Sequence, residues 1–163
     1  SLITVLKNHN VDSSLFEGVK KVNNKQTKLI ISILENSLDQ LKGKTISILG
    51  LAFKENSDDI RESKSISLIK YLLQKKCKIR VYDPLAIIPT KILFGTKITY
   101  YNTLSECVKN SNALVIMNTN KEFSNISKND LAKMKYRLII DTRRILKKID
   151  SNVEYHAIGV NKR

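Results

Sequence analysis

The sequence contains few of the residues that build metal clusters, disulfide frameworks or aromatic stacking surfaces. It has two cysteines, no tryptophan and 6% aromatic residues in 163 positions. Cys77 and Cys107 lie far apart, with no second metal-ligating residue near either, so neither a metal site nor a disulfide framework is indicated. We expect two core thiols in a reducing compartment. The sparse aromatics also argue against a platform on which nucleic-acid bases would stack.

Long apolar runs are lacking as well. No stretch approaches the roughly 20 apolar residues of a membrane-spanning helix. The start of the chain, SLITVLKNHN, has neither the basic region nor the cleavage site of a secretory signal. We therefore expect a cytoplasmic protein that has no membrane partner.

Acidic residues are outnumbered, with 15 Asp and Glu against 29 Lys and Arg, which gives a net charge of +14. A dense field of lysines attracts polyanions without a dedicated groove. The lysines are nevertheless spread along the chain, and no zinc-finger, helix-turn-helix or RNA-binding motif accompanies them. A non-catalytic basic module that binds a nucleotide or nucleic acid is therefore the alternative function, and nucleic acid is the less favoured partner.

The first part of the chain carries one long helical pattern. Ser14 and Glu17 have the spacing of a capping box, and apolar residues recur three and four positions apart up to Leu41, which predicts a helix over about 14–41. This helix either packs on its own domain or pairs with a second copy. Its apolar residues form two neighbouring rows, the first being Leu15, Val19, Val22, Leu29 and Ile33, and the second Ile30, Leu34, Leu38 and Leu41.

Strand and helix patterns then alternate to the end of the chain. This alternation predicts an α/β, Rossmann-like fold, in which a doubly wound, mainly parallel six-stranded sheet of order 3-2-1-4-5-6 follows the long connecting helix. We expect strands at 45–49, 78–82, 97–100, 113–117, 138–140 and 153–156, and helices at 65–75, 84–94, 104–109 and 127–134, the last with Ser127 and Asp130 as a capping pair.

Residues 48–65, ILGLAFKENSDDIRESKS, join the first of these strands to the next helix. The strand breaks at Gly50, and the polar turn that follows offers cations at Lys54 and Arg61 beyond the carboxyl end of the strand, where open α/β sheets bind ligands. A turn of this composition is also typical of a solvated loop, since Asp58 and Asp59 suit a helix start. The residues alone leave both interpretations open.

The amino-acid sequence of this turn resembles the sequence pattern of one family. Gly50, Phe53, Lys54 and the residues after them follow the pattern G-x-x-F-K-x-x-[ST]-D-D-x-R-x-S-x-S of the UDP-glucose and UDP-N-acetylhexosamine dehydrogenases. GVKKVNNKQ resembles the start of that family's long central helix, VYDP its second strand end, and IDTRR its D-G-R-[RN]. Asn118 and Asn120 replace the family's Thr and Trp, and Thr142 replaces a glycine, where a positive φ would strain threonine.

The resemblance implies a function and a division of the chain. Residues 1–42 would end a central domain with a dimerisation helix, and 43–163 would bind the UDP-sugar. The intact enzyme would use NAD to oxidise the C6 alcohol of UDP-glucose or a UDP-N-acetylhexosamine to the uronic acid. Phe53, Lys54 and Arg143 would contact the substrate, with Arg144 a weaker candidate, and Arg61 would reach the NAD.

The chain itself offers no catalytic residue. In the family, the catalytic cysteine and the glycine-rich NAD loop lie upstream of the part that this chain resembles, so we expect the chain alone to be inactive. The G-x-G-x-x-G fingerprint is missing, because Leu51, Ala52 and Phe53 follow Gly50 and their side chains would crowd a pyrophosphate. We therefore interpret Asp83 as a turn or cap residue rather than as a ribose ligand, and assign no role to either histidine.

Overall fold

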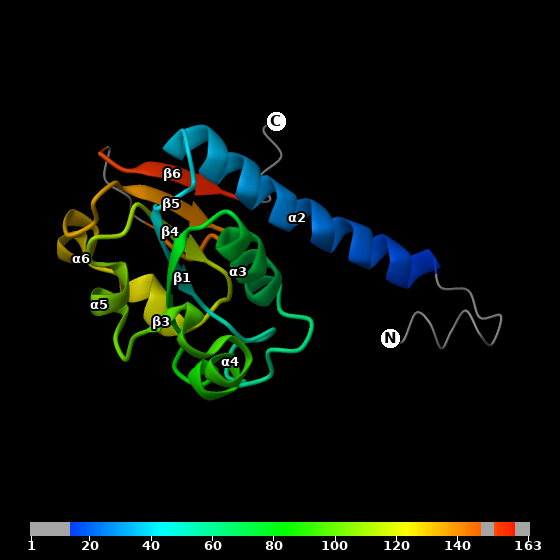
Figure 1. Ribbon diagram of the computed structural model, residues 1–163. Helices are drawn as coiled ribbons and strands as arrows, with labels where there is room; N and C mark the ends of the chain where they lie inside the picture. The colour runs from blue at the N-terminus through cyan, green and yellow to red at the C-terminus, as the bar shows by residue number, and fades with distance from the viewer. Residues whose placement is uncertain (1–13, 148–151, 159–163) are drawn as a thin grey trace.

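A six-stranded parallel sheet of order β3-β2-β1-β4-β5-β6 forms the centre of the molecule (Figure 1). The structure is a computed structural model that describes residues 14–147 and 152–158. The predicted strand order 3-2-1-4-5-6 is confirmed. The strands are β1 (Thr45–Leu49), β2 (Lys78–Tyr82), β3 (Thr99–Tyr100), β4 (Ala113–Ile116), β5 (Leu138–Asp141) and β6 (Glu154–Ala157).

The central strands are apolar and β-branched because both faces of the sheet are covered. Every residue of β4 and β5 is buried. The register places Leu49 opposite Tyr82 and Ile116, and Ile116 opposite Asp141. The residues that follow these strands therefore emerge level with one another along one edge, which we call the carboxyl edge.

Helices cover the two faces. One core contains buried residues of α2 (Ser14–Leu38), α3 (Lys64–Gln74) and α4 (Ile87–Phe94), and the other those of α5 (Leu104–Val108), α6 (Lys128–Ala132) and the 3-10 helix η2 (Lys121–Asn125). The predicted capping box of Ser127 and Asp130 is confirmed at the start of α6. None of the helices in the described ranges combines the length and apolarity that a membrane crossing needs.

The helix α2 ends at Leu38, three residues before the predicted end, where Asp39 takes a positive φ of 57°. The second predicted row lies in the core, with Ile30 and Leu34 fully buried, whereas Leu29 of the first row is 46% exposed. In Figure 1, α2 lies along α3 and its first turns extend beyond the sheet. The predicted cap at Ser14 and the apolar residues up to Val22 lie among side chains outside the described part.

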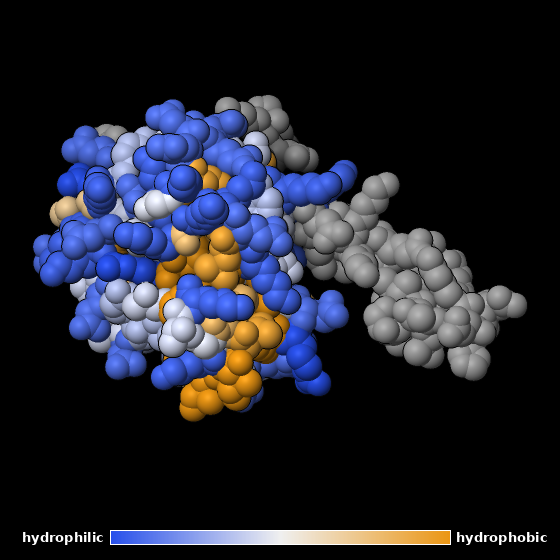
Figure 2. Space-filling view, in the orientation of Figure 1, coloured by the Kyte–Doolittle hydropathy of each residue, from blue (hydrophilic) through white to orange (hydrophobic). Residues whose placement is uncertain are grey.

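Two other elements start more than one residue away from the predicted position. The helix expected from Pro84 begins at Ile87, because the backbone before it forms a turn held by Asp83. The strand expected from Lys97 begins at Thr99, since the 3-10 helix η1 (Gly95–Lys97) precedes it. Figure 2 shows an apolar surface over α4, whose exposed residues include Ile88 and Ile92.

Candidate functional site

The loop after β1 is shaped by Gly50, whose φ is +89°. A Cβ at this position would lie 2.6 Å from the side chain of Asn118 and 2.9 Å from its backbone nitrogen. Both the backbone angle and this close approach require glycine. The hydroxyl of Ser65 donates to the Gly50 carbonyl at 2.6 Å. The loop is thus fixed at once to the end of β4 and to the start of α3.

The same loop is held from the other side by Asp83, whose carboxylate is buried after β2. It accepts hydrogen bonds from the backbone nitrogens of Leu51 at 2.7 Å, Ala52 at 3.4 Å, and Leu85 and Ala86 at 2.9 Å each. Our interpretation of Asp83 as a turn or cap residue is confirmed for the turn, whereas the N-cap position of α4 is taken by Ala86. A carboxylate of the protein already takes the N–H groups that a pyrophosphate would use in the usual dinucleotide loop.

A pocket of about 320 Å³ opens at the carboxyl edge, next to this loop. Phe53, Lys54 and Arg143, the three residues predicted to contact the substrate, all line it, together with Ser63, Lys64 and Met117. The expectation that Lys54 and Arg143 approach one crevice from two strand ends is confirmed. Three of the described lining residues are cations and none is acidic. The roles of these residues in binding stay a prediction.

Arg143 is aimed by a buried carboxylate. Its backbone nitrogen donates to Oδ1 of Asp141 at 3.0 Å, and its Nε donates to the Met117 carbonyl at 3.1 Å. Oδ2 of Asp141 accepts from the Leu146 backbone and from the Tyr155 hydroxyl, both at 3.0 Å. Burial, and then the charge of Asp141, raise the pKa of Tyr155 to about 12. The turn after β5 is therefore held by several hydrogen bonds, and it places the exposed side chain of Arg143 in the pocket lining.

The turn tolerates Thr142 without strain. Of the described residues of this turn, Arg144 has the positive φ, 55°, and Thr142 does not. Thr142 is buried, and both its backbone nitrogen and its Oγ1 donate to the Ile116 carbonyl. The side chain of Arg144 points toward the Ile158 carbonyl at 3.4 Å and is not part of the pocket lining.

The first turn of α3 adds backbone donors to the pocket. Ser63 is the N-cap residue, with φ −67° and ψ 129°, and within the described chain neither its side chain nor an acidic residue of the first turn caps the free N–H groups. Open N–H groups and the helix dipole make such an end favourable for an anion. The pocket thus joins a helix N-terminus to the three cations Lys54, Lys64 and Arg143.

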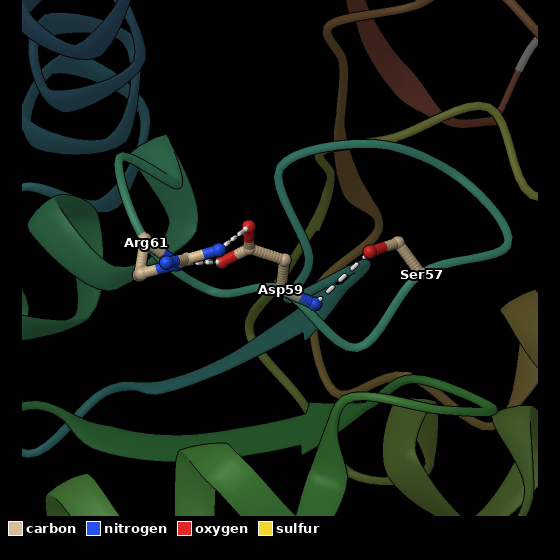
Figure 3. Close-up of polar contacts among 3 residues, drawn as sticks. All are labelled: Ser57, Asp59 and Arg61. Atoms are coloured by element: carbon tan, nitrogen blue, oxygen red, sulfur yellow. Dashed lines mark hydrogen bonds and ion pairs between the residues drawn. The ribbon is translucent and has the colours of Figure 1, made fainter.

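Arg61 lies elsewhere on the same loop. Figure 3 shows its guanidinium against the carboxylate of Asp59, with Nε to Oδ1 at 2.9 Å and NH2 to Oδ2 at 2.8 Å. These contacts lower the pKa of Asp59 to about 2. The side chain of Arg61 is 86% exposed and does not line the pocket. Arg61 thus forms a salt bridge with Asp59 in this chain, and a contact of Arg61 with a cofactor stays a prediction.

The comparisons with known proteins agree with this geometry. Residues 47–148 match the sequence model of the UDP binding domain of the UDP-glucose/GDP-mannose dehydrogenase family. The chain belongs to this family. The UDP-glucose 6-dehydrogenases YwqF and TuaD of Bacillus subtilis (strain 168) are 34% and 30% identical to it, each over 98% of this chain and over 37% and 35% of their own length. The chain therefore spans little more than a third of these relatives.

Solved structures of dehydrogenases share the fold. A UDP-glucose dehydrogenase from Pyrobaculum islandicum superposes with a TM-score of 0.75 at 21% identity, over 96% of this chain and 34% of that protein. The UDP-N-acetyl-mannosamine dehydrogenase Cap5O from S. aureus gives a TM-score of 0.71 at 25% identity, over 89% of this chain and 33% of its own.

Within this dehydrogenase fold, sequence reasoning missed three residues that shape the site, Asp141, Lys64 and Gln26. Asp141 was quoted as part of IDTRR but given no role, although it sets the turn that carries Arg143. Lys64 lines the pocket, and its Nζ donates to Oε1 of Gln26 on α2 at 2.5 Å. A lone aspartate at the end of a buried strand was a usable signal for Asp141. No local signal joins Lys64 to Gln26, which is 38 residues away.

Proposed function

We propose that this chain is the part of a UDP-sugar dehydrogenase that holds the UDP half of the substrate. In the intact enzyme the C6 alcohol of UDP-glucose or of a UDP-N-acetylhexosamine would be oxidised to the carboxylic acid, with NAD as the hydride acceptor. One observation carries the proposal: the family's Phe53, Lys54 and Arg143 line one pocket that is basic and sits on an open helix N-terminus.

The pocket has the chemistry that a nucleoside diphosphate requires. Arginine can grip phosphate oxygens with two parallel N–H donors, lysine supplies a compact charge, and helix N–H groups bind phosphate without any side chain. Phe53, which is 46% exposed beside these groups, offers an apolar wall for the base or the ribose. The affinity would come mainly from the phosphates, because they would contact all three cations that line the pocket.

Titration calorimetry tests this proposal. UDP and UDP-glucose should bind the 163-residue chain with measurable heat, whereas uridine, which lacks the phosphates, should bind much more weakly. An inorganic sulfate titration at the same ionic strength separates simple anion binding from recognition of the nucleotide. A chain that gave no heat with either UDP or UDP-glucose would contradict the proposal.

The chain alone should not oxidise a UDP-sugar. A nucleophilic cysteine must form a thiolate near neutral pH, but burial raises the pKa of Cys77 to about 11 and that of Cys107 to about 12. Both cysteines are buried in the core, where apolar surroundings disfavour the charged thiolate. We expect no NADH from the chain with UDP-glucose and NAD. Turnover that Cys77→Ser or Cys107→Ser abolished would overturn this expectation.

We further propose that α2 joins two copies of the chain. Ile30, Leu34 and Leu38 pack on the chain's own core and Ile33 lies partly against it, whereas Leu29 is exposed. The predicted first row, to which Leu29 belongs, would then form the seam of a dimer, and residues 1–42 would extend from the UDP-binding part, 43–163. Light scattering should report a dimer, and Leu29→Lys should yield monomers. A monomer at micromolar concentration in the unmodified chain would refute the seam.

A further inference from the structure

Lys64 is the pocket's least expected cation. It occupies the first position of α3, directly after the N-cap Ser63, and it lines the pocket with Lys54 and Arg143. Its ammonium donates a hydrogen bond to Oε1 of Gln26, which projects from α2. Lys64 thus stands between the helix that leads into the domain and the hollow at the carboxyl edge.

This position is electrostatically unfavourable when the pocket is empty. The N-terminus of a helix carries a partial positive charge, so a cation in the first turn is repelled. Partial burial and, after it, the charge of Arg143 lower the pKa of Lys64. The partner that the structure gives its ammonium is the neutral amide of Gln26, and among the described residues no carboxylate forms an ion pair with it. An anion in the pocket would offset these unfavourable interactions, because it would attract the ammonium, the Arg143 guanidinium and the helix N-terminus alike.

The three cations come from three separate elements. Lys54 belongs to the loop after β1, Lys64 to α3 and Arg143 to the turn after β5. A single phosphate could satisfy two of them, and the open end of α3 would hold it close to Lys64. A second, adjacent phosphate gives the remaining cation a partner of opposite charge. The number of cations, and their origin in three different elements, therefore fit two linked phosphates better than one.

We propose that Lys64, positioned by Gln26, is a phosphate-binding residue of this pocket and makes it select a nucleoside diphosphate over the monophosphate. The inference rests on the proposed function and adds to it a residue and a basis for discrimination. Gln26 acts through Lys64: its amide oxygen holds the ammonium at the pocket's rim without neutralising the charge that the phosphate needs.

A purely structural interpretation makes a different prediction. If Lys64 served only to hold α2 against α3 through Gln26, its replacement would loosen the packing of α2. The affinity for every ligand would then fall by the same factor. If Lys64 binds phosphate, its replacement would change the ratio of the affinities for UDP and UMP. This ratio is therefore the deciding quantity, because a general loss of stability does not move it.

Calorimetric titrations of UDP and UMP into the 163-residue chain measure the ratio. Lys64→Met keeps the length of the stem and removes the charge. It should weaken UDP binding about tenfold or more, on the scale of one lost hydrogen bond to a charged group, and UMP binding much less. Lys64→Arg should keep the unmodified ratio. Lys70→Met, which removes an exposed lysine of the same helix, is the matched control and should change neither affinity.

Gln26→Ala supplies an independent arm. It should lower the preference for UDP in the unmodified chain, and it should have no further effect on that preference in the Lys64→Met chain, because the two residues act as one unit. Additive losses would mean that Gln26 acts on its own and would overturn its positioning role.

The outcomes separate the inference from the proposed function. UDP binding by the unmodified chain with an unchanged UDP-to-UMP ratio in Lys64→Met would overturn the role of Lys64 and leave the UDP pocket standing. Absence of UDP binding in the unmodified chain would overturn both. A preference for UDP over UMP that falls in Lys64→Met but is kept in Lys64→Arg would support the inference.

Discussion

The two edges of the sheet carry similar charge but differ in how that charge is used. At the carboxyl edge the pocket is lined by Lys54, Lys64 and Arg143. At the amino edge, where the strands begin, a second hollow of about 420 Å³ is lined by Lys78, Arg80 and Lys97. Counting cations alone would make these two sites equivalent.

The difference lies in the backbone and in the partners of the arginines. Helices run antiparallel to the strands they connect, so their positive N-termini point to the carboxyl edge and their negative C-termini to the amino edge. Arg80 is also occupied, since its guanidinium donates to the Lys109 carbonyl and lies 5.0 Å from the ring centre of Tyr101. Net charge therefore attracts anions to both edges, but helix N-termini favour an anion only at the carboxyl edge.

The largest effect should follow from removing the carboxylate that fixes the loop after β1. Asp83→Ala leaves the buried backbone nitrogens of Leu51 and Ala86 without their acceptor, together with the partly exposed nitrogen of Leu85. We expect the free energy of unfolding to fall by about 3 kcal/mol or more, since each buried donor left unpaired costs about 1–3 kcal/mol. Urea unfolding followed by circular dichroism measures this loss.

The control for this substitution is Asp58→Ala, which removes an exposed carboxylate from the same loop and should change stability by no more than about 0.5 kcal/mol. UDP affinity should also collapse in Asp83→Ala, because the carboxyl edge loses its shape. Equal unfolding curves for the two variants would contradict the role given to Asp83.

The next largest effect separates the two edges directly. Lys54→Ala and Arg143→Ala should each weaken UDP binding by roughly 1.5–3 kcal/mol, the usual scale for a hydrogen bond to a charged group. Lys78→Ala and Lys97→Ala remove the same charge from the amino edge and should leave the affinity unchanged at physiological salt. Calorimetry on all four variants decides the matter. A uniform loss would mean that overall charge, and no particular pocket, binds UDP.

The sequence predicted most of the residues at the carboxyl edge, but not the long-range contacts that hold them in position. Strand order followed from the alternation of elements, and the strands 45–49 and 78–82 have the predicted bounds, because buried apolar runs with clear breaks depend on local sequence alone. Phe53, Lys54 and Arg143 came together because all follow parallel strands whose ends are level.

What was missed depends on contacts between distant segments. Asp83 holds Leu51 across 32 residues, and Lys64 meets Gln26 across 38. Neither pair has a periodic signal, since a side chain chooses such a partner only after the sheet has formed. The end of α2 was misplaced for a related reason: Leu41 continues the apolar spacing and is buried, but it does so from the turn beyond Asp39.

A smaller effect is expected in the turn that carries Arg143. Thr142→Gly restores the residue that the family pattern has, yet here it should lower the free energy of unfolding by about 1–2 kcal/mol. The reason is that it removes the hydrogen bond from Oγ1 to Ile116 and frees the unfolded chain. Arg144→Gly, at the neighbouring position with φ 55°, should cost little, because glycine adopts that angle freely. Thermal unfolding of both variants tests the pair, and a more stable Thr142→Gly chain would contradict it.

The smallest effect concerns Asp59 and Arg61, which lie on the carboxyl edge but outside its pocket. The hydrogen bonds from Arg61 hold the pKa of Asp59 at about 2. A lowered carboxyl pKa means that the pair contributes to stability above the ordinary pKa of about 3.9 and that this contribution is lost as the pH falls toward 2. Because both side chains face solvent, Arg61→Ala should return the carboxyl resonance of Asp59 to an ordinary titration by NMR, while the affinity for UDP stays unchanged. A loss of UDP affinity in Arg61→Ala would place this arginine inside the site. The UDP site would then include residues of the carboxyl edge that do not line the pocket.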